Sequence, residues 1–167
     1  MTARLAVPGA SLTAMLSTGD QAPDFTLRDQ NGQDVTLSTL TADKNVLVVF
    51  YPFAFSGICT GELDGIRDSL GDFVADDLQL LALSCDPMYA IRAWADDKGY
   101  FFPLLSDFWP HGEVARSYGV FHEGGGMAIR GTFLIDRDRI IRWSLVNGPG
   151  EERDFSGVRD ALREIRG

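Results

Sequence analysis

One cysteine of this chain stands where a reactive thiolate could form. Cys59 follows a hydrophobic run of strand type, Val46 to Tyr51, and a short loop that Pro52 opens. Apolar residues then recur every three to four positions, which predicts an amphipathic helix, at Leu63, Ile66, Leu70 and Phe73. In the first turn of a helix, exposed backbone N–H groups and the helix dipole favour an anion, which for cysteine is the thiolate. The position therefore predicts a nucleophilic cysteine.

The helix end alone stabilises such a thiolate too little. A free cysteine has a pKa of ~8.5, and lowering it to about 6 requires about 3.4 kcal/mol in favour of the charged form. A helix N-terminus supplies ~0.3–1 kcal/mol, and about 2 kcal/mol in a partly buried site. We therefore expect a fixed cation beside Cys59.

The residues before the cysteine resemble a known signature. Pro52, Ser56 and Cys59 have the spacing of the peroxiredoxin motif P-x-x-x-T/S-x-x-C, with serine in the threonine position. Further matching tracts are Ala22-Pro23-Asp24-Phe25, Ser84-Cys85-Asp86, Phe102-Pro103-Leu104-Leu105-Ser106-Asp107 and Arg130-Gly131-Thr132-Phe133. The tract from Pro103 to Gly112 is most similar to the one-cysteine AhpE-type peroxiredoxins of actinobacteria. The resemblance extends from about Gly19 to the C-terminal helix.

The resemblance implies a role for each residue of the motif. The arginine before Gly-Thr-Phe, Arg130, would lie beside Cys59 and contact both the thiolate and the peroxide oxygens. The Ser56 hydroxyl would hydrogen-bond the sulfur and the peroxide, and Pro52 would shield the thiolate. Glu62 would orient Arg130. The alternatives are a surface role for Arg130 and, for Glu62, an ordinary acidic residue favoured by the helix dipole.

Five other residues have less specific surroundings. Cys85 ends a second apolar run and is expected to be buried and inert, the alternative being that it resolves the Cys59 sulfenate as a disulfide. Phe108 and Trp109 are expected to line the pocket or a dimer face, or else to pack in the core. His111 and His122 are each expected to face solvent or to lie in a loop.

Composition limits the classes of function. The chain has 167 residues, 45% of them hydrophobic, and a net charge of -9, without a basic stripe. Nucleic-acid or membrane binding is therefore not expected, and the acidic groups at Asp72, Asp76, Asp77 and at Glu151, Glu152, Asp154 are interpreted as solvated faces. Two cysteines and two histidines are too few for a disulfide framework or a zinc site. We expect no metal or cofactor, and a reducing cytoplasm.

The elements that position these residues follow from turn signals and apolar periodicity. They are a hairpin over 22–37, a helical turn at 38–42, strands at 46–51, 78–84, 102–105, 132–135 and 140–146, and helices from 59 to about 75, from 86 to 99, over 113–118 and from 158. Two strand–helix–strand passes and a C-terminal hairpin followed by a helix predict an α/β, thioredoxin-like fold with a central mixed sheet flanked by helices. Residues 19–167 would form this domain and 1–18 a disordered extension, for which a targeting role is the alternative.

The function expected from the motif is that of a thiol peroxidase acting on hydroperoxides. Cys59 would become a sulfenic acid, and an external thiol would reduce it. By resemblance this thiol would be mycothiol-like, acting with a mycoredoxin, or a thioredoxin, and the protein would be a homodimer. A redox sensor or client-binding protein that uses Cys59 as a switch stays open as a rival. A thioredoxin-like disulfide exchanger is disfavoured, since no CxxC occurs.

Overall fold

The computed structural model describes residues 16–69, 71, 75, 77–148, 151 and 153–166. Most of the proposed N-terminal extension, residues 1–15, therefore lies outside the described part of the chain. Leu16 already packs against the hydrophobic core, and its backbone N–H donates to the carbonyl oxygen of Tyr118 at 3.5 Å. Residues 16–18, which the proposed extension includes, are thus described in the structure, and Leu16 contacts the core.

Seven of the described strands form one mixed sheet, in the order β2-β1-β5-β4-β3-β8-β9. Their bounds are β1 Thr26–Asp29, β2 Asp34–Thr36, β3 Asn45–Phe50, β4 Leu78–Ser84, β5 Leu104–Ser106, β8 Arg130–Ile135 and β9 Ile141–Asn147. Strand β4 runs parallel to both β3 and β5, whereas β8 runs antiparallel to β3. The predicted parallel strand–helix–strand passes and the mixed sheet are confirmed.

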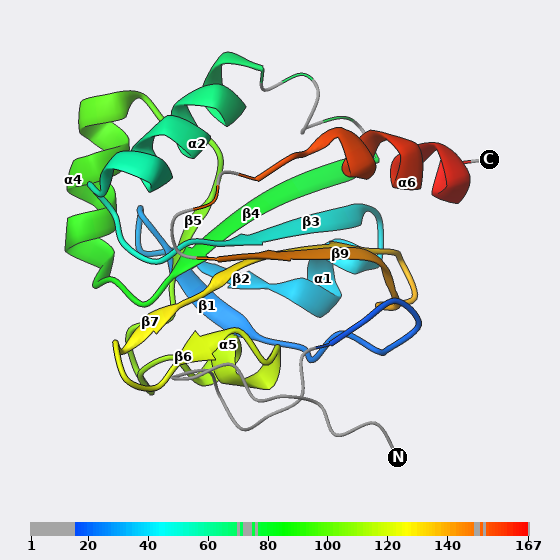
Figure 1. The fold of residues 1–167 in the computed structure, drawn as a ribbon, viewed down its shortest axis with the longest axis horizontal. Helices are drawn as coiled ribbons and strands as arrows, with labels where there is room; N and C mark the ends of the chain where they lie inside the picture. Colours follow the sequence, from blue (N-terminus) through cyan, green and yellow to red (C-terminus); the bar gives the residue numbers. More distant parts are fainter. Residues whose placement is uncertain are drawn as a thin grey trace.

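Helices cover both faces of this sheet. Their bounds are α1 Leu37–Thr41, α2 Gly57–Asp68, α4 Met88–Lys98, α5 Glu113–Ser117 and α6 Ser156–Arg166. Helices α2, α4 and α6 lie on one side, and α1 and α5 lie on the other together with a small hairpin, β6 Phe121–His122 and β7 Met127–Ala128 (Figure 1). None of the helices in the described ranges is long and apolar enough to cross a membrane.

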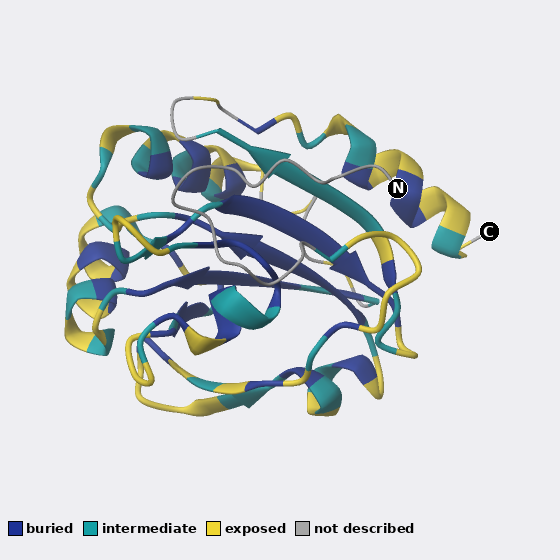
Figure 2. Ribbon diagram, turned by 60° about the horizontal axis from the view of Figure 1, so that its bottom comes forward, coloured by how far each residue is buried: buried dark blue, intermediate teal, exposed yellow. Residues whose placement is uncertain are grey.

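Side-chain alternation along the central strands divides the core into two halves. All six residues of β3 are buried, as Figure 2 shows for the middle of the sheet. Leu47 and Val49 point to the face of α2, α4 and α6, whereas Val46 and Val48 point to the face of α1 and α5. Period-two alternation in a strand buried on both faces explains this division. Each half has its own cluster of packed side chains.

The prediction for the helix after Cys59 was too long. Helix α2 ends at Asp68, because Ser69 has a non-helical backbone with φ -116° and ψ 30°. Ala75 pairs with Leu78 in an isolated β-bridge, so the chain has already turned back toward the sheet there. The predicted helix positions Leu70 and Phe73 lie outside the described residues.

Candidate active site

Cys59 lies in the first turn of α2, on the side that faces the sheet. Helix α2 begins at Gly57, after Ser56 as its N-cap residue in extended conformation, so Cys59 is the third helical residue. The side chain of Cys59 is fully buried and packs in the same cluster as Tyr51 and Leu63. The predicted helix-start position is confirmed, and the sulfur lies beyond the carboxyl end of β3.

Sheet topology brings an arginine to this sulfur from far along the chain. Strand β8 runs antiparallel to β3, so the start of β8 lies beside the end of β3, from which the loop to Cys59 departs. Arg130 is the first residue of β8 and only 3% exposed. Its Nη2 atom donates a hydrogen bond to the Sγ atom of Cys59 at 3.3 Å. The contact between guanidinium and sulfur that the motif implied is present in the structure.

Glu62 connects this arginine to a second one. Its side chain is 4% exposed, and its Oε1 atom accepts a hydrogen bond from Nη1 of Arg130. Its Oε2 atom accepts from Nε of Arg153 at 2.8 Å. The carboxylate therefore holds two guanidinium groups at once, one at each oxygen, through charge-assisted hydrogen bonds.

Arg153 is a site residue that the sequence analysis missed. Its Nη1 atom donates to Thr132 Oγ1 and to the carbonyl oxygen of Gly131, each at 3.0 Å, and its Nη2 atom donates to the carbonyl oxygen of Phe50. Burial lowers the pKa of Arg153 to about 10 despite the opposing charge of Glu62. The signal in the sequence was weak: one arginine within the acidic tract 151–154, which was interpreted as a solvated loop.

The buried side chains around the sulfur carry a net positive charge. Arg130 and Arg153 carry two positive charges, and Glu62 carries one negative charge. Because an uncompensated buried charge is costly, this arrangement suits an anion beside the two guanidinium groups.

Pro52 and Ser56 lie in the loop between β3 and α2, and Ser56 makes a different contact from the expected one. The Ser56 hydroxyl donates to the carbonyl oxygen of Phe53 at 3.0 Å, not to the sulfur. This local bond three residues back is a common competitor for serine hydroxyls. Pro52 is half-buried in the same loop, between β3 and α2.

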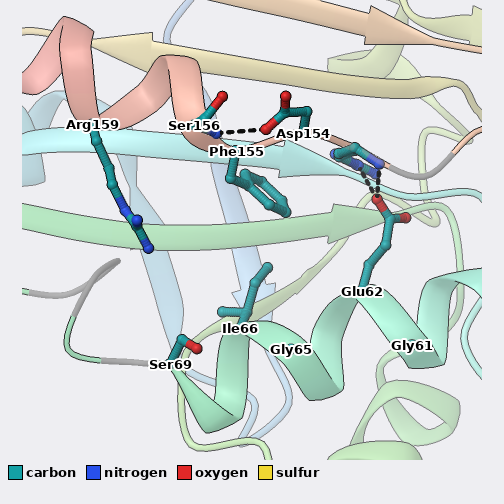
Figure 3. Close-up of a pocket in the computed structure, with 10 residues that line it drawn as sticks. Gly61, Glu62, Gly65, Ile66, Ser69, Asp154, Phe155, Ser156 and Arg159 are labelled. Atoms are coloured by element: carbon teal, nitrogen blue, oxygen red, sulfur yellow. Dashed lines mark hydrogen bonds and ion pairs between the residues drawn. The ribbon is translucent and has the colours of Figure 1, made fainter.

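A cavity lies next to this site without reaching the sulfur. It has a volume of about 410 Å³ and runs between α2 and the segment that enters α6. Figure 3 shows Ile66 and Phe155 facing each other across it, and Glu62 at one end. Cys59 and Arg130 do not line it. Among the described residues, no group of three or more His, Cys, Asp or Glu side chains could hold a metal ion.

The second cysteine lies on the opposite face of the sheet. Cys85 follows β4 and packs with Val48 and Leu83 in the cluster beneath α1 and α5. Burial, with the nearby charge of Asp107, raises the pKa of the Cys85 thiol to about 12. Both cysteines are free thiols. The expectation of a buried and unreactive Cys85 agrees with this position.

Phe108 and Trp109 are on the surface, so the alternative that they pack in the core is wrong. Trp109 is 81% exposed and Phe108 is 46% exposed. They line a groove of about 530 Å³ with Tyr89 and residues of β1, and no residue of the Cys59 site lines this groove. Of the two histidines, His111 lies in a turn, as expected, whereas His122 ends strand β6. His111 contacts the carbonyl oxygen of Gly126 at 2.7 Å, and His122 accepts the N–H of Gly125 at 2.8 Å.

Comparisons with known proteins agree with this site. The chain is 55% identical over 151 residues to "Alkyl hydroperoxide reductase E" of Mycobacterium tuberculosis. This alignment covers 90% of this chain and 99% of that protein. It is 38% identical over 154 residues to "Peroxiredoxin 2" of Thermoplasma acidophilum, covering 89% of this chain and 75% of that protein.

Solved structures and a family model give the same result. The structure of "Peroxidoxin BcpB" from Mycobacterium tuberculosis matches with a TM-score of 0.80 and 33% identity, covering 92% of this chain and 100% of that chain. The structure of Enterococcus faecalis AhpC matches with a TM-score of 0.81 and 25% identity, covering 91% of this chain and 93% of that chain. The thioredoxin-like fold is thereby confirmed. Residues 18–144 match the model of the AhpC/TSA family, and the chain therefore belongs to the AhpC/TSA family of peroxiredoxins.

Proposed function

We propose that this protein is a thiol peroxidase that reduces hydrogen peroxide and organic hydroperoxides through Cys59. The observation that carries the proposal is the buried hydrogen bond of 3.3 Å from Arg130 Nη2 to Cys59 Sγ. A thiolate is the nucleophile that cleaves a peroxide, and a guanidinium that contacts it also stabilises charge on the leaving oxygen. The mycobacterial relative at 55% identity bears a hydroperoxide reductase name.

Each residue of the site has a part in the proposed reaction. The Cys59 thiolate attacks one oxygen of the peroxide, and the O–O bond breaks as the S–O bond forms. Arg130 stabilises the negative charge on the departing oxygen, which takes a proton to leave as water or alcohol. Glu62 holds Arg130 in place, and Pro52 keeps water from the thiolate. Ser56 would assist by turning its hydroxyl from the Phe53 carbonyl toward the bound peroxide.

We infer that an external thiol completes the cycle by a one-cysteine mechanism. Cys85 lies on the other face of the sheet from Cys59, with the strands between them, so an internal disulfide would require part of the fold to open. The external thiol would form a mixed disulfide with Cys59, and a second thiol would release the reduced enzyme. A mycothiol-like thiol with a mycoredoxin, or a thioredoxin, is the proposed reductant.

The reductant must reach a sulfur that is fully buried in the structure. Cys59 has no exposed surface, and it lies in the first turn of α2, directly after the loop 52–56. We infer that one of these segments moves when the mixed disulfide forms. Two free thiols suit a reducing compartment, so a cytoplasmic location is proposed. A homodimer that pairs through exposed aromatic residues is also proposed.

The decisive experiment compares Cys59→Ser with Cys85→Ser. Peroxide consumption is followed with a dithiol as the reductant, and intact mass reports oxygen addition or a disulfide. We expect Cys59→Ser to abolish turnover and Cys85→Ser to retain it, with one added oxygen in the oxidised protein. Turnover by Cys59→Ser would refute the proposal. An internal disulfide in the unmodified protein would instead favour an atypical two-cysteine mechanism with Cys85 as the resolving residue.

The same assay separates an enzyme from a redox sensor. A non-catalytic sensor or client-binding protein would oxidise Cys59 once and would consume no further peroxide when thiol is supplied. Sustained consumption over many equivalents is the result expected of a peroxidase.

A further inference from the structure

Tyr51 carries a buried hydroxyl that has no hydrogen-bond partner among the described residues. Tyr51 follows β3 and is fully buried, and its hydroxyl oxygen is one of a few buried side-chain atoms left without a partner in the described part of the chain. Leaving a hydroxyl unpaired in the interior costs free energy, so such a group calls for an explanation.

The two other buried tyrosines show what is usual in this fold. The hydroxyl of Tyr118 donates to the carbonyl oxygen of Pro23 at 2.8 Å. The hydroxyl of Tyr100 donates to the Asp64 carboxylate at 2.6 Å. Tyr51 is therefore the exception among the buried tyrosines of the described ranges.

Tyr51 belongs to the same buried cluster as Cys59 and directly follows β3. The last pair of the parallel ladder is Phe50 with Leu83, and Tyr51 is the next residue, on the same face of the sheet as Val49. Its ring packs against Trp94 of α4 with 5.4 Å between ring centroids. Cys59 packs in the same cluster, so the phenol lies in the buried space between α2, α4 and the end of the sheet.

The hydroxyl keeps its proton there and can donate a hydrogen bond. Burial raises the pKa of the Tyr51 hydroxyl far above its usual range, the neighbouring Ser84 side chain opposes this in part, and the nearby charges of Asp86 and Cys59 raise the pKa further. The phenol therefore keeps its proton at any physiological pH. An anionic acceptor that arises nearby would satisfy it.

We propose that the Tyr51 hydroxyl donates a hydrogen bond to the oxygen that Cys59 gains on oxidation and so stabilises the sulfenate. The inference rests on the proposed function, in which the thiolate takes one oxygen from the peroxide and the other leaves as water or alcohol. The sulfur is oxidised by two electrons and the peroxide is reduced by two, and the remaining proton is lost from the sulfenic acid as the sulfenate forms. The donor is unpaired in the reduced enzyme and paired in the oxidised one.

This pairing makes the effect of the hydroxyl depend on the oxidation state. A donor to the charged form lowers the pKa of an acid, so the sulfenic acid of Cys59 ionises more readily with Tyr51 than without it. In Tyr51→Phe, the pH at which the sulfenic acid ionises should rise by about one unit, a tenfold change in the ionisation constant. The pH dependence of further oxidation to sulfinic acid reports this ionisation.

The test compares Tyr51→Phe with Tyr118→Phe, both in a Cys85→Ser background so that Cys59 is the sole thiol. Thermal unfolding midpoints are measured for the reduced protein and for protein oxidised with one equivalent of hydrogen peroxide, with one added oxygen checked by intact mass. We expect Tyr118→Phe to lower both midpoints equally, because it removes a bond present in both states. Tyr51→Phe should leave the reduced midpoint unchanged or raise it, and should lower the oxidised midpoint.

Two results would overturn the inference. Equal losses in both redox states of Tyr51→Phe would show a structural bond, for which the neighbouring Ser84 hydroxyl is the available partner. An unchanged pH for sulfenic acid ionisation would show that the hydroxyl does not contact the oxygen. Failure of the background protein to gain an oxygen at Cys59 would instead refute the proposed function.

Discussion

At the scale of single residues, Glu62 organises the site. Its two oxygens hold Arg130 and Arg153, and these arginines reach Cys59 and the backbone of the two central strands. Buried charges cost free energy unless they are paired and hydrogen-bonded, and the carboxylate of Glu62 is paired with both guanidinium groups. The nucleophile is therefore held in position by the same contacts that join α2 to the sheet.

Replacement of Arg153 should destabilise the protein strongly. Arg153→Met leaves the Glu62 carboxylate with one guanidinium, and it leaves the carbonyl oxygens of Phe50 and Gly131 without this donor. Breaking a buried ion pair by removal of one partner costs about 3–5 kcal/mol. We expect a loss of this size in the free energy of unfolding, measured by urea denaturation.

Arg166→Met is the matched control. Arg166 forms a bidentate pair with Asp77 at 2.6 Å, but the two side chains are 42% and 46% exposed. Exposed pairs contribute roughly 0–1 kcal/mol, because water screens the charges. Equal losses in the two variants would contradict the role given to burial of Arg153.

How well each site residue could be predicted depends on how far apart in the sequence it and its contact partners lie. Pro52, Ser56 and Cys59 share one loop and one helix start, so their spacing indicates the site. Arg130 lies 71 residues from Cys59 and is predictable only because a short motif accompanies it. Arg153 has no motif, and its partners lie on other elements. The Ser56 contact depends on rotation of a hydroxyl, which the sequence does not encode.

At the scale of elements, the entry to α5 depends on a glycine. Gly112 has φ +69°, and a Cβ atom there would lie 2.2 Å from the buried ring of Phe121. Gly99, at the end of α4, has nearly the same φ of +70° but open space around it. Gly99→Ala should therefore cost about 1 kcal/mol for the left-handed backbone alone. Gly112→Ala should cost about 1–3 kcal/mol more, by thermal or urea unfolding, since the ring must move. Similar losses at both positions would contradict this packing argument.

A carboxylate also holds α5, and it makes the stability of the protein depend on pH. Asp107 is 2% exposed and accepts the N–H groups of Val114 and Ala115 at 3.1 and 2.9 Å. Burial nevertheless raises the pKa of Asp107 to about 6. The folded state thus binds the proton more tightly than the unfolded state, in which the pKa is ~3.9.

Protonation of Asp107 therefore stabilises the folded state. This stabilisation is fully present below pH ~4 and is lost as the pH rises through about 6. Over that range it amounts to about 3 kcal/mol at most. In Asp107→Asn, the difference in unfolding free energy from the unmodified protein should change between pH 4 and pH 7. A difference that stays constant with pH would contradict the prediction.

Elements were easier to predict than their ends. Strand β4 has the predicted bounds, because a strand that is buried on both faces is mostly apolar and so forms a recognisable run. The end of α2 was misplaced, since the apolar spacing continues beyond Asp68 although the backbone turns at Ser69. The β6–β7 hairpin was not predicted as strands, because two short strands around Gly124-Gly125-Gly126 offer too few residues for a periodic pattern.

At the scale of the whole molecule, the central sheet separates two thiols of different character. Alternation along β3 and β4 gives each face its own core, with Cys59 in one and Cys85 in the other. Within the described part of the chain, an arginine donates a hydrogen bond to the sulfur of Cys59 and none does so to that of Cys85. The sheet thus keeps the two buried thiols apart, which supports the use of an external reductant.

The outer surface near β1 and α4 carries the features expected of a subunit interface. Tyr89, Phe108 and Trp109 are exposed and line one groove, and exposed apolar groups of this kind mark interaction sites.

Trp109→Ser should therefore shift the proposed homodimer toward monomer, with at least a tenfold increase in the dissociation constant, about 1.4 kcal/mol. Phe101→Ser is the control, since Phe101 is 89% exposed but does not line the groove. Sedimentation over a range of concentrations measures both. A monomeric unmodified protein would contradict the dimer, and equal weakening by both variants would contradict its placement at this groove.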